Sequence, residues 1–111
     1  MSTVWIVHDK GGMDIHDAER FGEVKSLFTD HASFDVRDAY FKCAEILARD
    51  GKADDWLLPC GQQVLNVAAV TAFQQQFGRL NLLMFHAIKR AYVPQELILI
   101  KEKVDDPVRA Q

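Results

Sequence analysis

Cysteine is scarce in this sequence, and its spacing excludes two common classes of small protein. Only Cys43 and Cys60 occur among the 111 residues, and they lie far apart in the chain. This spacing matches neither a CxxC zinc-ligand pair nor the cysteine framework of a disulfide-stabilised domain. We therefore expect a domain that folds without disulfides or zinc and needs no oxidising compartment.

A secretory leader and a membrane span are also missing from the pattern. No basic segment precedes the first apolar run at residues 3–8, which disfavours a signal peptide. The longest stretch without charge covers residues 56–78, but Pro59, Gly61 and five glutamines interrupt its apolar character. We expect a cytoplasmic protein with no membrane contact.

An excess of positive charge is the third feature that the chain lacks. The formal net charge is −3, and Lys89 and Arg90 form the only adjacent basic pair. Proteins that bind DNA or RNA generally present a basic face, because contacts to phosphates supply much of their affinity. The charge balance therefore disfavours general nucleic-acid binding.

Strand-like and helix-like segments alternate along the chain. Apolar runs bounded by turn residues predict strands at residues 3–8, 56–60 and 80–86, and an edge strand at 97–101. Helical patterns are found at residues 14–21, 34–50 and 62–77. Residues 23–28 are either a further strand or an extension of the first helix.

This alternation is typical of βαβ units with right-handed crossovers. The three central runs are apolar on both faces, as in strands covered by helices on both sides. The last strand follows its neighbour closely, so that pair is expected to be antiparallel. We predict a three-layer, Rossmann-like α/β domain with a mostly parallel sheet of four or five strands and an antiparallel edge strand. The domain would span residues 1–103, followed by a flexible tail at 104–111.

Two loops would follow the carboxyl ends of predicted strands, where open parallel sheets bind ligands. If their strands are neighbours, the loops at residues 8–17 and 59–63 face one crevice. Gly61 would let backbone amides at a helix N-terminus hold an anion, and Lys10 would add charge; the alternative is that the glycines only permit turns. The predicted ligand-binding residues are His8, Asp9, Lys10, Gly11, Gly12, Asp14, His16, Cys60, Gly61, Gln62, Gln63 and His86.

Other assignments for polar residues are weaker. A metal site from His8, Asp14, His16 and Asp17 competes with a plain polar loop, which we favour because the spacing is irregular. Cys60 lacks a complete set of partners for nucleophilic catalysis. Residues 89–92 combine two cations with an aromatic ring and would suit a nucleotide or an acidic partner, although a solvated turn is the simpler interpretation. We assign no catalytic residue, metal or cofactor.

The helix at residues 62–77 is apolar around nearly its whole circumference. One sheet face cannot cover such a helix, and exposed apolar surface commonly marks a contact between proteins. We therefore expect a homo-oligomer.

Residues 14–22 (DIHDAERFG), together with segments of residues 57–94 that include LLPCG and FGRLNLL, resemble small α/β proteins of tailed bacteriophages. The resemblance covers most of residues 3–94 and implies an infected bacterial cytoplasm as the setting, but transfers no catalytic residue. The first functional hypothesis is a non-enzymatic binder of a small anionic or nucleotide-like ligand that sequesters a host signal. The alternatives are an oligomeric interaction module that inhibits a host protein complex, and a small enzyme using Cys60.

Overall fold

The computed structural model describes residues 2–9, 14–29 and 35–98. Five strands and three helices follow one another in these segments: β1 (Thr3–His8), the 3₁₀ helix η1 (His16–Phe21), β2 (Glu23–Phe28), α1 (Val36–Asp50), β3 (Trp56–Leu58), α2 (Gln63–Phe77), β4 (Arg79–His86) and β5 (Ala91–Ile98). The predicted tail at residues 104–111 lies outside the described residues.

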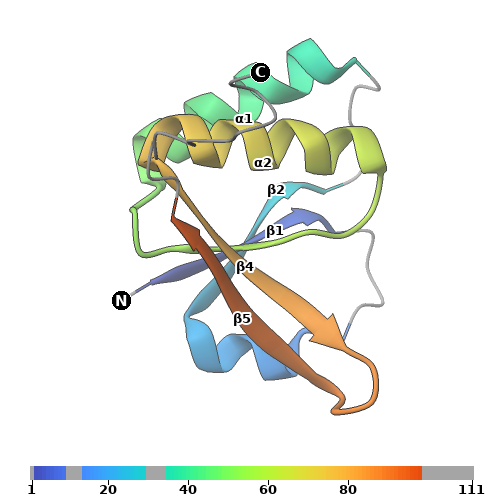
Figure 1. Ribbon diagram of the computed structural model, residues 1–111. Coiled ribbons are helices and arrows are strands. Elements are labelled where there is room, and N and C mark those ends of the chain that lie inside the picture. Colours follow the sequence, from blue (N-terminus) through green and yellow to red (C-terminus); the bar gives the residue numbers. More distant parts are fainter. Residues whose placement is uncertain (1, 10–13, 30–34, 99–111) are drawn as a thin grey trace, which may run out of the picture.

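The strands form one sheet in the order β2-β1-β3-β4-β5. The pairs β2–β1, β1–β3 and β3–β4 are parallel, and β5 is antiparallel to β4. Figure 1 shows α1 and α2 on one face of the sheet and η1 on the other. The predicted α/β fold is therefore confirmed, with β1, β3 and β4 as the three central strands.

One strand differs from the sequence-based expectation, and one open assignment is decided. The edge strand β5 begins at Ala91 instead of residue 97, because it pairs with β4 residue by residue from His86↔Ala91 to Arg79↔Ile98. Pro94 is tolerated in it because an edge strand leaves half of its amides without a partner strand. Residues 23–28 form a strand, since Gly22, with φ 153°, ends η1 in an extended conformation that is open almost only to glycine.

Two apolar layers hold the sheet between its helices. The larger layer packs α1 and α2 against one face through residues such as Leu27, Leu47, Leu65 and Phe73. The smaller layer lies under η1 and includes Ala18, Val4, Ile6, Leu83 and Tyr92. Burial of β1 on both faces explains why its sequence is apolar throughout.

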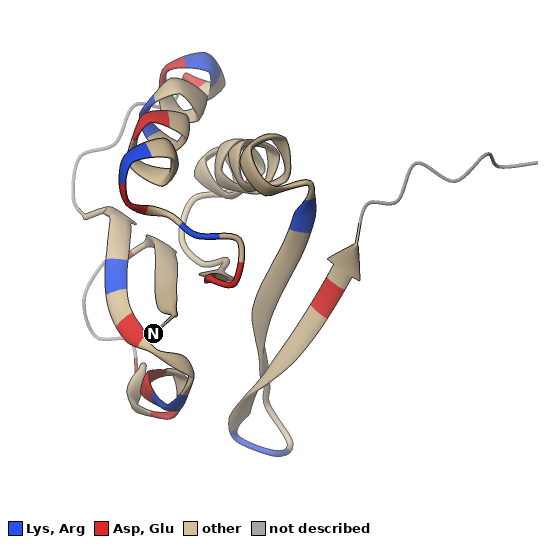
Figure 2. Ribbon diagram, turned by 90° about the vertical axis from the view of Figure 1, so that its left-hand side faces the viewer, with Lys and Arg blue, Asp and Glu red and all other residues tan. Residues whose placement is uncertain are grey.

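Most of the apolar surface of α2 is covered within one chain. Leu65, Ala68 and Phe73 are among its residues buried against α1 and the sheet, whereas Val67 remains exposed. Figure 2 shows that charged residues gather on α1 and η1, and α2 carries none. The expected self-association therefore needs a different surface from most of this helix.

Asp55 joins several elements at the amino ends of the strands. Its side chain is fully buried and accepts hydrogen bonds from the backbone N–H of Thr3 (2.8 Å), the indole N–H of Trp5 (3.0 Å) and the backbone N–H of Lys52 (2.8 Å). The Asn81 side-chain amide donates to the Asp55 carbonyl oxygen at 2.9 Å. One residue thus connects β1, β3, β4 and the loop after α1.

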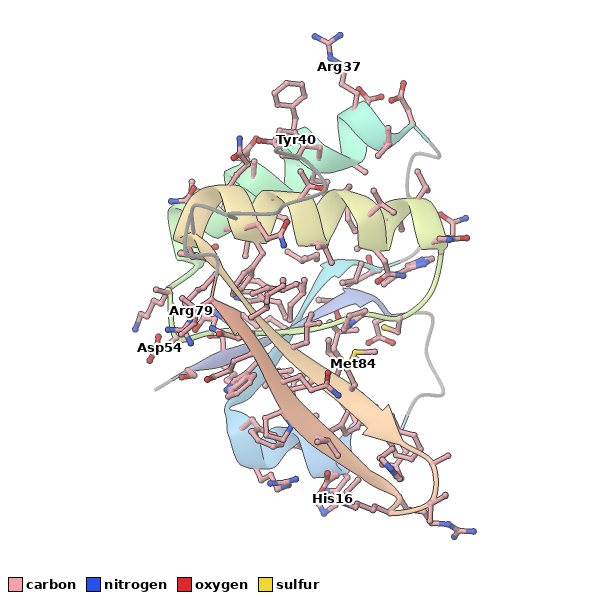
Figure 3. The ribbon with its side chains drawn as sticks, viewed as in Figure 1. His16, Arg37, Tyr40, Asp54, Arg79 and Met84 are labelled. Carbon is pink, nitrogen blue, oxygen red and sulfur yellow. The ribbon has the colours of Figure 1, made fainter. Side chains whose placement is uncertain are left out.

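We predict that Asp55→Ala lowers the free energy of unfolding by at least about 3 kcal/mol, because it leaves buried donors without acceptors. Urea denaturation followed by circular dichroism measures this change. Asp54→Ala is the matched control, since Asp54 is exposed, accepts one hydrogen bond among the described residues, from the Ser2 hydroxyl, and lies at the periphery of the molecule (Figure 3). Equal losses in the two variants would contradict the assigned role of Asp55.

Candidate functional site

The predicted crevice would lie at the carboxyl ends of β1 and β3, which are neighbours in the sheet. The two loops do follow neighbouring parallel strands, because Trp5 pairs with Leu57 and Ile6 with Leu58. The chain adds β2 on one side of β1 and then adds β3 and β4 on the other side, so the strand order reverses between β1 and β3. Open α/β sheets bind ligands at such a reversal. The condition stated for a shared crevice is therefore met for the strands that precede these loops.

His8 packs on the turn after β3 at this edge of the sheet. Its buried imidazole accepts a hydrogen bond from the backbone N–H of Gln62 through Nδ1 at 3.3 Å, and its carbonyl oxygen lies 3.4 Å from the Cys60 thiol. Gly61 has φ 79°, and a Cβ at this position would lie 2.5 Å from the Cβ of His8. Gly61 is required here because the imidazole packs directly on the turn. An anion at the Gln62 amide would have to displace His8.

Asn66, which the sequence analysis did not single out, organises the same turn from the first turn of α2. Its Oδ1 accepts from the Cys60 N–H at 2.9 Å, and its Nδ2 donates to the carbonyl oxygens of Cys60 at 3.1 Å and Gln62 at 2.9 Å. Gln62 Oε1 is buried without a hydrogen-bond partner among the described residues, whereas Gln63 is exposed. The turn after β3 is thus held mainly by internal hydrogen bonds.

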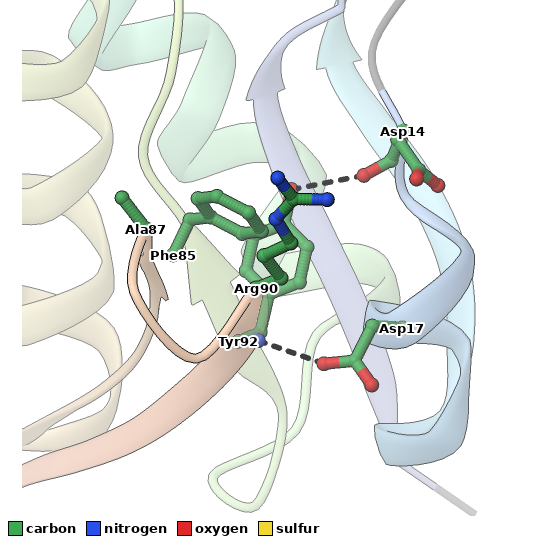
Figure 4. Close-up of a pocket in the computed structure, with 6 residues that line it drawn as sticks. All are labelled: Asp14, Asp17, Phe85, Ala87, Arg90 and Tyr92. Carbon is green, nitrogen blue, oxygen red and sulfur yellow. Dashed lines mark hydrogen bonds between the residues drawn. The ribbon is translucent and has the colours of Figure 1, made fainter.

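A surface pocket of about 480 Å³ opens between η1 and the β4–β5 hairpin. We call it the hairpin pocket. Its size is within the usual range for small-molecule sites. Figure 4 shows the lining residues, which are Asp14, Asp17, Phe85, Ala87, Arg90 and Tyr92.

Tyr92 and Asp17 fix one wall of the hairpin pocket. The Asp17 carboxylate accepts from the Tyr92 backbone N–H at 2.7 Å and from the Arg20 Nε at 3.1 Å, and Arg20 also donates to the Tyr92 carbonyl oxygen at 2.9 Å. The Tyr92 amide, followed by Arg20, lowers the pKa of Asp17 from its ordinary value. These bonds hold η1 against β5 although the two are distant in sequence.

The aromatic wall continues toward the turn after β3. The rings of Phe85 and Tyr92 meet edge to face at a centroid distance of 5.3 Å, and the Tyr92 hydroxyl donates to the Asp14 carbonyl oxygen at 3.3 Å. Burial, followed by the nearby Cys60 thiol, raises the pKa of Tyr92. Tyr92 therefore links the hairpin pocket to the turn after β3.

Arg90 is the cation of the hairpin pocket. It has φ 51°, the only left-handed backbone among the described residues other than glycine. Its guanidinium makes no hydrogen bond or ion pair with another residue in the described segments, although two carboxylates line the same pocket. This side chain is available to a ligand.

The remaining predicted residues are scattered. His16 is 93% exposed and lies 3.4 Å from Glu19 on η1, and exposed His86 accepts the Lys89 N–H at 3.2 Å. The Asp9 N–H donates to Phe28, and Lys10, Gly11 and Gly12 lie outside the described residues. Of the nine predicted residues that the structure describes, Asp14 alone lines the hairpin pocket. In the described segments, no group of three or more histidine, cysteine or acidic residues is placed to hold a metal ion.

The sequence contained one signal for the hairpin pocket that was interpreted otherwise. Residues 89–92 combine two cations with an aromatic ring, a pattern for which the sequence alone favours a solvated turn. Phe85 and Ala87 were not singled out, because their place beside Asp14 depends on the antiparallel return of β5. Without that pairing, nothing in the sequence brings residues 14 and 90 together.

The fold and the hairpin pocket define a small α/β domain with a mixed, mostly parallel sheet and a surface site beside its carboxyl ends. The family model described as "Phage Pam3 gp32-like protein" matches residues 2–99, and the chain belongs to this family. This match confirms the resemblance to phage proteins. No curated protein and no solved structure matches the chain. No helix in the described segments is long and apolar enough to cross a membrane.

We predict that Gly61→Ala lowers stability more than Gly78→Ala does. Both glycines have left-handed backbone, but an added Cβ meets His8 at Gly61 and nothing within 4 Å at Gly78. Backbone strain alone costs roughly 1–2 kcal/mol, so the excess at Gly61 reports the displaced imidazole. Chemical denaturation of both variants measures the difference. Equal losses of unfolding free energy would show that the His8 imidazole moves aside without destabilising the fold.

We predict that Asp17→Asn destabilises the fold in a pH-dependent manner. A carboxylate whose pKa is lowered in the folded state stabilises that state above its unfolded pKa of about 4, and this stabilisation disappears as the pH falls through the folded pKa. The difference in unfolding free energy between wild type and variant should be constant near neutral pH and shrink in acid. Asp50→Asn, which alters an exposed pair with Arg49, is the control. A difference that persists unchanged in strong acid would exclude the ionic contribution of Asp17.

Proposed function

We propose that this protein is a non-enzymatic binder of a small anionic, nucleotide-like ligand, and that the ligand occupies the hairpin pocket. The observation that supports this most is that Arg90, without a partner among the described residues, shares a pocket of about 480 Å³ with two aromatic rings and with Asp14. A cation, an apolar wall and a hydrogen-bond acceptor are the groups that a nucleotide requires.

Each group has a distinct role in this proposal. The Arg90 guanidinium would pair with a phosphate through two parallel hydrogen bonds. Phe85, which is half exposed, and Tyr92 would contact the base. Asp14 would accept hydrogen bonds from ribose hydroxyls, the role that an acidic residue plays in dinucleotide-binding folds.

The charge of the pocket restricts the ligand further. Asp17 is paired with Arg20, whereas the Asp14 carboxylate forms no ion pair among the described residues and accepts the His16 N–H at 3.1 Å. One guanidinium between two carboxylates does not suit several phosphates. The proposal therefore favours a nucleoside monophosphate or a cyclic mononucleotide over a triphosphate.

The thiol of Cys60 argues for binding rather than catalysis. Burial raises the pKa of Cys60, so the thiol is protonated at neutral pH. A catalytic cysteine needs the opposite shift, because the thiolate is the nucleophile. In an infected cell, a phage protein that holds a nucleotide without consuming it would sequester a host signal, which is the role we propose.

We predict that calorimetry with a panel of nucleoside monophosphates and cyclic mononucleotides finds a ligand, and that Arg90→Gln weakens its binding by at least about tenfold, as expected for loss of the charged hydrogen bonds to the phosphate. Lys89→Gln is the matched control, because this neighbouring cation does not line the pocket. Equal effects of the two variants would indicate attraction by charge alone. The proposal fails if no member of the panel binds more tightly than about 1 mM.

A further inference from the structure

Exposed apolar side chains are concentrated on the β4–β5 hairpin. Among the described residues, eight large hydrophobic side chains are exposed, and five of them belong to this hairpin. They are Met84, Phe85, Ile88, Leu97 and Ile98. Exposed apolar patches of this kind mark contact surfaces.

One face of the hairpin carries a strip without charge. Leu80 and Leu82 belong to the layer under α2, so alternation along β4 places Met84 on the same face. The pairs Met84↔Val93 and Leu80↔Leu97 add two residues of β5 to this face. We call Leu82, Met84, Val93, Gln95 and Leu97 the hairpin strip. Met84 is 40% and Leu97 55% exposed.

Charge is confined to the two ends of the hairpin. Lys89 and Arg90 lie at the turn, and Arg79 and Glu96 form a 3.5 Å ion pair near the other end. Figure 2 shows this distribution, with blue at the turn, blue and red near the other end and tan between them. The loop that carries Asp54 reaches the same end, because Asn81 donates to the Ala53 carbonyl oxygen at 2.8 Å. Within the hairpin itself, the turn is thus basic, and the acidic residue, Glu96, lies at the opposite end.

We infer that the hairpin strip is the contact surface of a symmetric dimer of this chain, with the two hairpins antiparallel. In a two-fold contact the same patch meets itself, so a strip without charge causes no repulsion. The antiparallel direction places Lys89 and Arg90 of each copy toward the end that carries Asp54 and Glu96 in the other. A partner with an acidic surface would match only the turn and leave the strip uncovered.

Pairing through the outer edge of β5 is a less suitable way to form the dimer. Pro94 removes a backbone donor from that edge, and Glu96 adds a charge to it. Proline and charged residues are the means by which edge strands avoid pairing with other chains. The two copies would therefore contact each other through the faces of their hairpins, not through their edges.

The experiment is sedimentation velocity of the whole chain over micromolar to millimolar concentrations. We expect wild type to approach twice the 12.6 kDa mass of one chain. The double variant Met84→Glu with Leu97→Glu should stay monomeric, because it brings like charges together across the two-fold axis. Circular dichroism checks that the variant is folded, which is expected because both side chains are exposed.

Two controls locate the contact. Phe41→Glu alters an equally exposed apolar residue on α1 and should leave the dimer intact. Ile98→Glu alters the opposite face of β5, which continues toward the hairpin pocket, and should also leave it intact. A wild-type mass of one chain at every concentration, a dimer that survives the double variant, or a dimer lost in Phe41→Glu would overturn the inference. The proposed nucleotide site lies on the other face of the hairpin, so the outcome of the binding experiment does not decide whether the dimer forms.

Discussion

The buried carboxylate of Asp55 is the interaction on which the arrangement of the sheet depends. Its side chain binds N–H groups of β1 and of the loop after α1, and its carbonyl oxygen binds Asn81 of β4. A buried charge is tolerated only when hydrogen bonds replace its lost hydration, so these segments must meet at one point. Because β3 starts at the next residue, Asp55 also sets where this short central strand enters between β1 and β4.

With the amino ends of the strands held in this way, side chains at the carboxyl ends determine where a ligand has room. At the turn after β3, internal hydrogen bonds with His8 and Asn66 occupy the polar groups of the backbone. The hairpin pocket lies beside that turn, where β5 returns next to β4 and its Tyr92 is tied to Asp17 of η1. The hairpin therefore has two faces with separate proposed roles, a ligand site toward η1 and a dimer contact toward α2.

The sequence predicted most elements because local features act over a few residues. The apolar run of residues 3–8 matches β1, Asp35 accepts the Arg37 N–H as the N-cap of α1, and Gly78 ends α2 with φ 68°. The start of β5 was placed too late, because Ala91 and Gln95 have no strong strand preference and become a strand only by pairing with β4. The sequence indicates that a glycine is needed at position 61. The reason for this need is the His8 imidazole packed against the turn, and these two residues are more than fifty positions apart in the chain.

The sequence by itself determined the α/β class, the central strands and the residues of the two loops, since hydrophobic period and turn chemistry are local properties. Only the tertiary structure decided which of those polar groups remain available. It paired the Gln62 amide with His8, left His16 in solvent and brought Asp14 to Arg90. The physical reason is that availability depends on competition among donors and acceptors from distant segments, which becomes defined only when the sheet has assembled.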